Sequence, residues 1–346
     1  PDDAGGWRAA LDSDTAARLG AAMADMTPPP AAEAFIADLG WAGEIVPLAG
    51  DASFRRYFRV RSGGRNAVLM DAPPPHEDPR PFIGVAEWLT THGFPAPAII
   101  GADLDHGLVL LEDFGDARMR EAIDAEPDAT SGLYERAVDL LVELRRHPAG
   151  PLEPYDRTVL HLEADLLTQW YCPAVGIDAD QAGYTAAWDA VFDHALSAQP
   201  VTVLRDYHAE NLMLVGEDRA LGLLDFQDAL AGHPAYDLVS LLQDARRDVE
   251  PEIEAAMLQR YCAETGAEED FLAAYYVLGA QRNAKIVGIF TRLWKRDGKP
   301  RYPTLCPRVW RYLEADLAQP VLAPVAAWFD ANIPPAMRGD PSGIGA

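Results

Sequence analysis

The chain has 346 residues, a formal net charge of −25 and an isoelectric point near 4.5. A surface this acidic repels phosphate backbones and anionic lipids, so we expect neither nucleic acid nor a membrane as a partner. Apolar residues make up 49% and charged residues 24% of the sequence, which is typical of an ordinary globular protein of about two domains.

The cysteines and the first residues predict a cytoplasmic protein. Cys172, Cys262 and Cys306 are widely spaced and form no CxxC pair, so neither a disulfide framework nor a zinc site is expected. The opening residues lack the basic and then apolar pattern of a signal peptide. No segment approaches the run of about 18 apolar residues that a membrane-spanning helix needs. The oligomeric state stays open.

The first third of the chain is predicted to be rich in β-strands. Residues 1–30 are rich in Asp, Ala and Gly and are expected to form a loosely ordered leader. A short helix over 31–39 is followed by three strand candidates, with a hairpin signal at 62–66. A helix over 82–91 and two further strands complete a small β-rich lobe over 31–114.

Helical patterns dominate the rest of the chain, so 115–346 is expected to form a larger, mostly helical second lobe. Helices are predicted at 131–146, 160–171, 182–197, 236–246, 251–264 and 269–296. The predicted fold class is therefore α+β, with two lobes of unequal size.

A compact β-like segment interrupts these helices between Val201 and Phe226. One apolar run leads to Asp206, a second follows Asn211, and a third ends at Asp225, fourteen residues after Asn211. Each residue alone could be a turn or cap residue, but the joint spacing is typical of kinases. Phosphoryl transfer needs Mg²⁺, which prefers carboxylate and amide oxygens, and a carboxylate that accepts the proton of the acceptor hydroxyl.

The stretches LRDYHAENLML and LGLLDFQDALAGHPAYDL, which contain these residues, resemble the aminoglycoside phosphotransferase family. Members of this family are small-molecule kinases with a protein-kinase-like fold, and the resemblance covers roughly residues 33–300. It implies ATP and Mg²⁺ as cofactors, Asp206 as the catalytic base, and Asn211 and Asp225 as magnesium ligands. It also implies that Asp237 braces the catalytic loop and that Asp206 and His208 contact the substrate. Leu204 stands where the family usually has His, at a position that is generally structural.

The first lobe contains the candidate ATP contacts. Residues 47–53 resemble the phosphate-covering loop of the family, in which small residues such as Gly50 and Ser53 let backbone N–H groups approach phosphate. The same residues also suit a plain hairpin turn. Residues 110–114 resemble the hinge, so Glu112 and Phe114 are expected to meet the adenine.

The lysine that kinases of this fold carry on the third strand is missing. Met70 stands at its place and residues 1–284 contain no lysine, so either the protein is inactive or an arginine substitutes. Strand alternation puts Arg55 and Arg59 on one face and Arg56 on the other. Arg55 directly follows the predicted phosphate-covering loop and is therefore the predicted substitute.

Three further stretches, DASFRRYFRV, VLMDAPP and GIFTRLWKRDGKPRY, resemble one branch of the family. Its members phosphorylate the anomeric hydroxyl of N-acetylmuramate and N-acetylglucosamine during cell-wall recycling. VLM in place of VLK is a feature of this branch, which favours substitution over inactivity. At helical spacing, basic residues including Arg282 and Arg292 fall on one arc of the helix 269–296. They are either an exposed basic face or the binding site for the lactyl carboxylate or a phosphate.

Two other functions stay open. One is an aminoglycoside or choline-like small-alcohol kinase on the same fold, and the other is a catalytically silent nucleotide-binding protein. A polycationic acceptor would favour a cleft rich in Asp and Glu, whereas a sugar acid would favour one rich in Arg and Lys.

Overall fold

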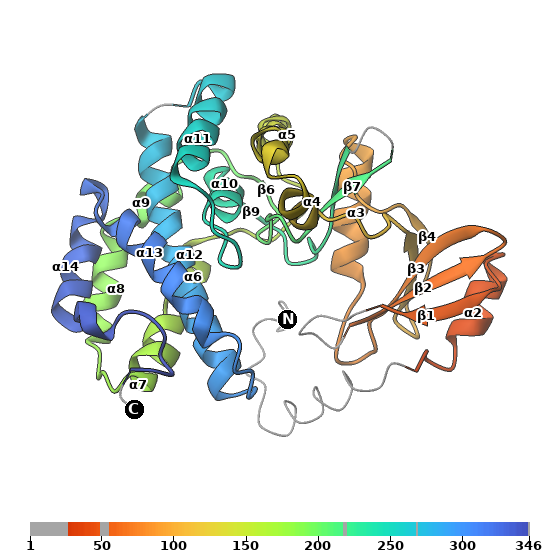
Figure 1. Ribbon diagram of the computed structural model, residues 1–346, viewed down its shortest axis with the longest axis horizontal. Helices are drawn as coiled ribbons and strands as arrows, with labels where there is room; N and C mark the ends of the chain where they lie inside the picture. Colours follow the sequence, from red (N-terminus) through yellow and green to blue (C-terminus); the bar gives the residue numbers. More distant parts are fainter. Residues whose placement is uncertain (1–26, 49–54, 217–219, 268, 345–346) are drawn as a thin grey trace. The chain divides into compact units, whose positions relative to one another are not determined.

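The computed structural model describes residues 27–48, 55–216, 220–267 and 269–344 (Figure 1). Gly50 and Ser53, the predicted phosphate-covering residues, lie outside these ranges. The described chain divides into two compact units. The first comprises the residues up to Arg118 together with Leu212–Asp228, and the second comprises Met119–Asn211 and the residues from Ala229 onward.

The first unit is built on a five-stranded antiparallel sheet with the strand order β1-β2-β3-β5-β4. Two helices, α2 (Ala32–Asp38) and α3 (Arg80–Thr91), accompany the sheet (Figure 1). The strands are β1 (Glu44–Pro47), β2 (Arg56–Ser62), β3 (Arg65–Asp71), β4 (Ile99–Asp103) and β5 (Leu108–Glu112).

The predicted hairpin signal is confirmed as the turn between β2 and β3. Gly63 and Gly64 have φ angles of 57° and 79°, a left-handed conformation that glycine adopts without a steric penalty. The turn fixes the register, in which Phe58 lies opposite Leu69 and Tyr57 lies opposite Met70. Phe58 and Leu69 pack into the core with Ile36 of α2, so Tyr57 and Met70 belong to the other face of the sheet.

A second hairpin of the first unit comes from much later in the chain. It consists of β7 (Leu212–Val215) and β8 (Ala220–Leu223). Its backbone is bonded to the earlier segment, because the Leu214 N–H donates to Ala117 O at 2.7 Å and the Leu223 N–H donates to Pro95 O at 2.8 Å. The predicted division into 31–114 and 115–346 did not include this return of the chain to the first unit.

The second unit is mostly helical, as predicted, and its longest helix, α12 (Glu269–Lys295), is buried along much of its length (Figure 1). A short two-stranded sheet joins β6 (Val201–Val203) to β9 (Leu230–Gly232). The other α-helices are α4 (Met119–Ala125), α5 (Thr130–Leu144), α6 (Arg157–Ala164), α7 (Cys172–Ala174), α8 (Gln181–Asp189), α9 (Phe192–Ala195), α10 (Ala235–Leu242), α11 (Pro251–Thr265), α13 (Cys306–Leu317) and α14 (Ala323–Asn332).

Shorter helical turns complete the second unit. A π-helical turn covers Leu167–Tyr171, and 3₁₀ turns cover Pro127–Ala129, Pro303–Leu305, Pro320–Leu322 and Pro335–Met337. Across the ranges that the structure describes, every helix is too short or too polar to span a lipid bilayer.

Candidate active site

The loop after β6 brings Asp206 and Asn211 together in the second unit. The Asn211 N–H donates to His208 O at 2.9 Å, which closes a turn between the two residues. The Asn211 side chain then donates from Nδ2 to the backbone carbonyl of Asp206 at 3.0 Å. Because the amide nitrogen bonds the backbone, the amide oxygen is the atom of this side chain that suits a hard metal ion.

The carboxylate of Asp237, on α10, holds the backbone just before Asp206. It accepts hydrogen bonds from the N–H groups of Leu204 at 2.7 Å and Arg205 at 2.8 Å. Burial raises the pKa of Asp237 from 3.8 to about 7, although the two backbone hydrogen bonds act in the opposite direction. This is the geometry that a bracing role requires of Asp237.

Two residues of the candidate site have an unusual backbone conformation. Outside glycine, the described residues with a positive φ are Arg205, at 71°, and Asp225, at 59°. Left-handed non-glycine residues are costly and persist where the surrounding structure holds them in place. One precedes the predicted base and the other is a predicted metal ligand.

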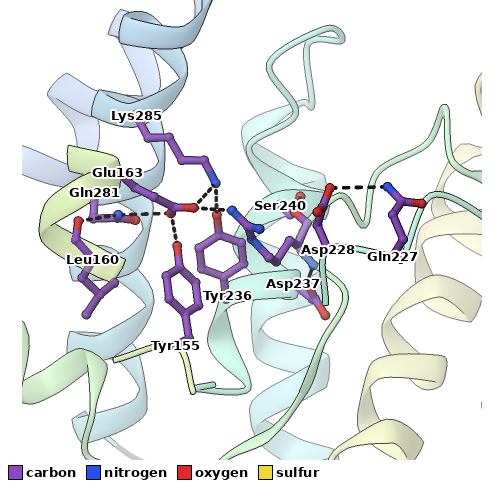
Figure 2. A network of polar contacts seen from close by, with 11 residues as sticks. Tyr155, Leu160, Glu163, Gln227, Asp228, Tyr236, Asp237, Ser240, Gln281 and Lys285 are labelled. Carbon is purple, nitrogen blue, oxygen red and sulfur yellow. Dashed lines mark hydrogen bonds and ion pairs between the residues drawn. The ribbon is translucent and has the colours of Figure 1, made fainter. Parts of the chain in front are cut away.

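Arg205 is held by a buried network centred on Glu163 of α6, which Figure 2 shows from close by. The Glu163 carboxylate pairs with the guanidinium of Arg205 and accepts the hydroxyl hydrogen bond of Tyr155. It also accepts a hydrogen bond from Lys285 Nζ of α12 at 2.8 Å, and Lys285 Nζ donates to the hydroxyl of Tyr236 at 3.2 Å. Burial alone would raise the pKa of Glu163, but Lys285 and Arg205 lower it to about 2.

Positive charge surrounds Asp206. Burial would raise the pKa of its carboxyl, but neighbouring cations outweigh this effect and hold it below the usual range. The neighbours responsible, in order of effect, are His208 in its protonated form and then Lys285, Arg205 and Arg282, which are cations at neutral pH. Asp206 therefore remains an ionised and weakly basic carboxylate.

Two further predicted substrate contacts, His208 and Arg282, are buried near Asp206 and have different partners. His208 is 3% exposed, and its Nε2 lies 3.0 Å from Nη1 of Arg246. Arg282 is buried and donates from Nη2 to the Ser240 hydroxyl at 2.8 Å. The Ser240 hydroxyl in turn donates to the carbonyl of Arg205 at 3.0 Å. His208 is thus part of the loop that carries Asp206, and Arg282 is connected to that loop through Ser240.

The structure does not bring Arg292 to the same place as Arg282. Arg292 is ten residues further along α12, and the charges that act on it are those of Arg296 and Asp297. Burial lowers the pKa of its guanidinium, and Arg296 adds to this effect. Besides Arg282, the basic residue of α12 whose charge lowers the pKa of Asp206 is Lys285.

The first unit carries Asp225 and the arginine that was predicted to replace the missing lysine. Asp225 accepts a hydrogen bond from Gln227 Nε2 at 3.0 Å, and the next residue, Phe226, stacks on Phe82 of α3 at 4.9 Å between ring centroids. Burial lowers the pKa of Arg55, but neighbouring acidic groups raise it above the usual range. These groups are the phenol of Tyr57, which is charged only when ionised, and the carboxylates of Glu77, Asp225 and Asp228.

The predicted hinge residues lie at the end of β5. The backbone N–H of Glu112 donates to Ala98 O at 2.9 Å, and its carboxylate accepts from the Ala98 N–H at 3.2 Å. The ring of Phe114 packs against the backbone of Gly222, where a Cβ atom would stand 2.6 Å from the ring. Phe114 thus occupies space that only glycine at position 222 leaves open.

Sequence reasoning missed several residues that the structure places beside the predicted site. Glu163 and Tyr155 precede the catalytic loop by more than 40 residues and belong to no recognisable spacing. Glu77, whose carboxylate oxygen lies 3.8 Å from Nε of Arg55, lies within a proline-rich segment. Lys285 belongs to the predicted basic arc of the helix 269–296, although it was not named there as a substrate contact.

Comparisons with known proteins show which family the chain resembles in sequence. The phosphotransferase enzyme family, APH, matches residues 44–275. An N-acetylmuramate/N-acetylglucosamine kinase of Caulobacter vibrioides is 40% identical over 334 residues, covering 83% of this chain and 91% of that protein. The protein of the same name from Pseudomonas aeruginosa is 41% identical over 305 residues, covering 83% and 88%.

Solved structures show the fold. A putative aminoglycoside phosphotransferase of Ralstonia eutropha matches with a TM-score of 0.59 at 16% identity, covering 87% of this chain and 98% of that one. The choline kinase LicA of Streptococcus pneumoniae matches with a TM-score of 0.55 at 13% identity, covering 84% and 97%. The kinase-like α+β fold predicted from the sequence is therefore confirmed. By the extent of its sequence match, the chain belongs to the APH phosphotransferase family.

Proposed function

We propose that the protein is an ATP-dependent kinase that phosphorylates the anomeric hydroxyl of N-acetylmuramate and N-acetylglucosamine. The names of its relatives support this acceptor. The observation that carries the proposal is the buried cation Arg282 close to Asp206, because the two other cations there, Lys285 and Arg205, are paired with Glu163. A site of this charge suits an acceptor that carries a carboxylate, as N-acetylmuramate does.

Asp206 acts in this proposal on the acceptor hydroxyl. Its carboxylate orients the hydroxyl and accepts the proton as the oxygen attacks phosphorus. A carboxylate with a lowered pKa is a weak base for an ordinary alcohol. It is better matched to an anomeric hydroxyl, which is more acidic than other sugar hydroxyls because the ring oxygen withdraws electrons.

The metal site in this proposal consists of the Asn211 amide oxygen and the Asp225 carboxylate. Both are hard oxygen donors of the kind that Mg²⁺ prefers, and Asn211 is oriented by its bond to the Asp206 carbonyl. Mg²⁺ bound there would neutralise charge on the β- and γ-phosphates.

Arg55 takes the place of the missing lysine in this proposal. The register of β2 and β3 puts Tyr57 opposite Met70, and Arg55 precedes Tyr57 by two residues, so it shares the sheet face of Met70. Met70 itself is fully buried. The carboxylate of Glu77 faces the Arg55 guanidinium, as the glutamate of the kinase lysine–glutamate pair faces its lysine. Glu112 and Phe114, with Gly50 and Ser53, complete the proposed ATP contacts.

The charge around Asp206 also separates the acceptor classes. A polycationic aminoglycoside or a quaternary ammonium such as choline would be repelled by Arg282. The carboxylate of N-acetylmuramate would be attracted, with Arg282 as its proposed contact. Arg292 remains a proposed outer contact of the same helix.

A panel assay tests the proposed function. ADP release is measured with amino sugars, aminoglycosides and choline, each with ATP and Mg²⁺, and the product is identified by phosphorus NMR. We expect turnover of the two N-acetylated sugars and an anomeric phosphate as the product. Turnover of aminoglycosides or choline alone would favour the other kinase function, and ATP binding without turnover would favour the silent one.

A further inference from the structure

The contact between His208 and Arg246 determines which ring nitrogen of His208 carries the proton. Arg246 Nη1 lies 3.0 Å from His208 Nε2. A guanidinium only donates hydrogen bonds, so Nε2 must accept and the proton of the neutral ring must sit on Nδ1. Burial lowers the pKa of His208, and Arg246 and Arg282 act in the same direction, which keeps the ring neutral. Asp244 and Asp206 oppose this effect.

The Nδ1–H of His208 is a buried donor. Within the described ranges, Nδ1 has no hydrogen-bond partner in the protein, and the ring is 3% exposed. A buried donor left without an acceptor costs about 1–3 kcal/mol, so such groups are rare except where a ligand uses them. His208 follows Asp206 by two residues, and each of the two groups acts on the pKa of the other. The donor therefore belongs to the surroundings of the catalytic carboxylate.

A chain of charged side chains holds this arrangement in place. Arg246 Nε lies 3.4 Å from one carboxylate oxygen of Glu210, and Arg120 Nη1 of α4 lies 2.9 Å from the other. The Arg246 N–H also donates to Asp244 Oδ1 at 2.8 Å. Arg246 is thus fixed on both its side chain and its backbone, so the tautomer of His208 does not depend on a mobile partner.

From this geometry we propose that His208 Nδ1–H donates to the carbonyl oxygen of the acceptor's 2-acetamido group, with Arg246 as the positioning residue. The inference rests on the proposed function. Asp206 addresses the hydroxyl on C1, and the acetamido group is on the adjacent carbon in both sugars. The carbonyl oxygen of the acetamido group can only accept a hydrogen bond. His208 Nδ1 can only donate one while Nε2 accepts from Arg246. Arg282 would meet the lactyl group, which only N-acetylmuramate has, so His208 recognises what the two sugars share.

Two substitutions at His208 separate the two ring nitrogens. In asparagine the amide nitrogen is as many bonds from the backbone as Nδ1, and in glutamine it is as many bonds away as Nε2. His208→Asn therefore keeps a donor at the proposed place, whereas His208→Gln moves it. The kcat/KM of each variant is measured with N-acetylglucosamine and with glucose, which has a hydroxyl on C2. Where glucose turns over too slowly for kcat/KM to be measured, the inhibition constant of glucose against N-acetylglucosamine is measured instead.

We expect His208→Gln to lower kcat/KM for N-acetylglucosamine about 10-fold to 100-fold, the effect of losing one hydrogen bond to a buried polar group. In the same variant, kcat/KM for glucose and the KM for ATP should change much less. His208→Asn should retain most of the selectivity for N-acetylglucosamine over glucose. Unchanged selectivity in His208→Gln, or equal losses for both sugars in both variants, would overturn the inference while leaving the proposed function intact. Failure of the unchanged protein to phosphorylate either N-acetylated sugar would overturn both.

A second variant tests Arg246. In Arg246→Met the ring loses the donor that fixes its tautomer, so the proton of the neutral ring is free to move from Nδ1 to Nε2. We expect the selectivity for N-acetylglucosamine over glucose to fall and the ¹⁵N NMR signals of the His208 ring to show both tautomers, whereas Arg246→Lys, which keeps a donor, should restore part of the selectivity. Arg247→Met, which removes the adjacent arginine paired with Asp124, is the matched control. A selectivity and a tautomer identical to those of the control would show that Arg246 does not set the state of His208.

Discussion

The carboxylate of Asp237 lies 2.8 Å from the backbone N–H of Arg205, the residue immediately before the predicted catalytic base. Its second oxygen accepts from the N–H of Leu204, so one buried side chain fixes two successive peptide groups. A carboxylate with a pKa near 7 thus supports the loop of another carboxylate, Asp206, whose pKa is below the usual range. The two acids should therefore affect different parts of a pH profile.

The pH dependence of kcat should report Asp237. Protonation of this group removes negative charge and one acceptor from the loop, so we expect kcat to fall as the pH drops through about 7. Stability should respond in the opposite sense. Because the folded pKa is raised above 3.8, the group favours the folded state at low pH, and this contribution is lost as the pH rises through about 7. In Asp237→Asn the limb near pH 7 should be absent, and its persistence would assign it to another group.

Asp206→Asn should bind ATP nearly as well as the unchanged protein and lose most turnover. The substitution keeps the size of the side chain but removes the proton acceptor, whose loss costs on the order of 10²–10⁴-fold in rate. Single-turnover kinetics and ATP binding by calorimetry check the two statements separately. Rates near those of the unchanged protein would reject Asp206 as the base.

Asp225→Ala should abolish magnesium-dependent turnover, because the phosphate charge then loses the carboxylate that holds the metal. A titration of activity with Mg²⁺ measures this effect. Asp228→Ala is a useful comparison, since Asp228 acts on Arg55 as Asp225 does but lies outside the kinase spacing. If Asp225→Ala keeps its metal dependence, the metal is bound elsewhere.

Glu163→Gln should strongly destabilise the fold. Removing one partner of a buried ion pair leaves Arg205 and Lys285 without their carboxylate and costs about 3–5 kcal/mol. Since the pKa of Glu163 is lowered from 4.5 to about 2, its contribution is present above pH 4.5 and is lost as the pH falls through about 2. Denaturant unfolding at several pH values measures both effects. Glu143→Gln, an exposed change beside Arg146, serves as the control and should alter little.

Changing Arg282 and Arg292 to Gln tests the recognition of the sugar acid. We expect kcat/KM for N-acetylmuramate to fall about tenfold to hundredfold, since a charge-assisted hydrogen bond contributes roughly 1.5–3 kcal/mol. N-acetylglucosamine lacks the carboxylate and should be affected much less. The single variants separate the two arginines, and Arg282→Gln should account for most of the loss because Arg282 acts on Asp206. Equal losses for both sugars would make the pair structural.

Much of the fold could be predicted because it follows local patterns. The alternation of β2 gave its faces correctly, since Phe58 and Val60 pack with α2 in the core. The individually predicted helices end at residue 296, in contrast, yet α13 and α14 form beyond it. Pro307 and Pro324 resemble helix breakers in the sequence, but each lies in the first turn, where proline is well tolerated.

The residues of the site could be predicted only where they follow a short, regular spacing in the sequence. Asp206, Asn211 and Asp225 lie within twenty residues of one another, whereas Glu163 meets Arg205 from 42 residues away and Lys285 from 122 residues away. Such contacts depend on how helices pack, which no local pattern shows. The grouping of the segment Leu212–Asp228 with the first unit is of the same kind, because its backbone partners Pro95 and Ala117 lie far upstream.

The backbone conformation of Arg205 and its side-chain contact favour different types of residue. Its φ of 71° is one that glycine adopts most easily, whereas its buried contact with Glu163 needs a cation. In evolutionary terms, position 163 should therefore be more constrained than position 205. A glycine at 205 still leaves Glu163 paired with Lys285, whereas a neutral residue at 163 leaves Arg205 and Lys285 both without their carboxylate. Homologues that lack the acid at 163 should also lack both cations, and such covariation among the three positions would record the constraint.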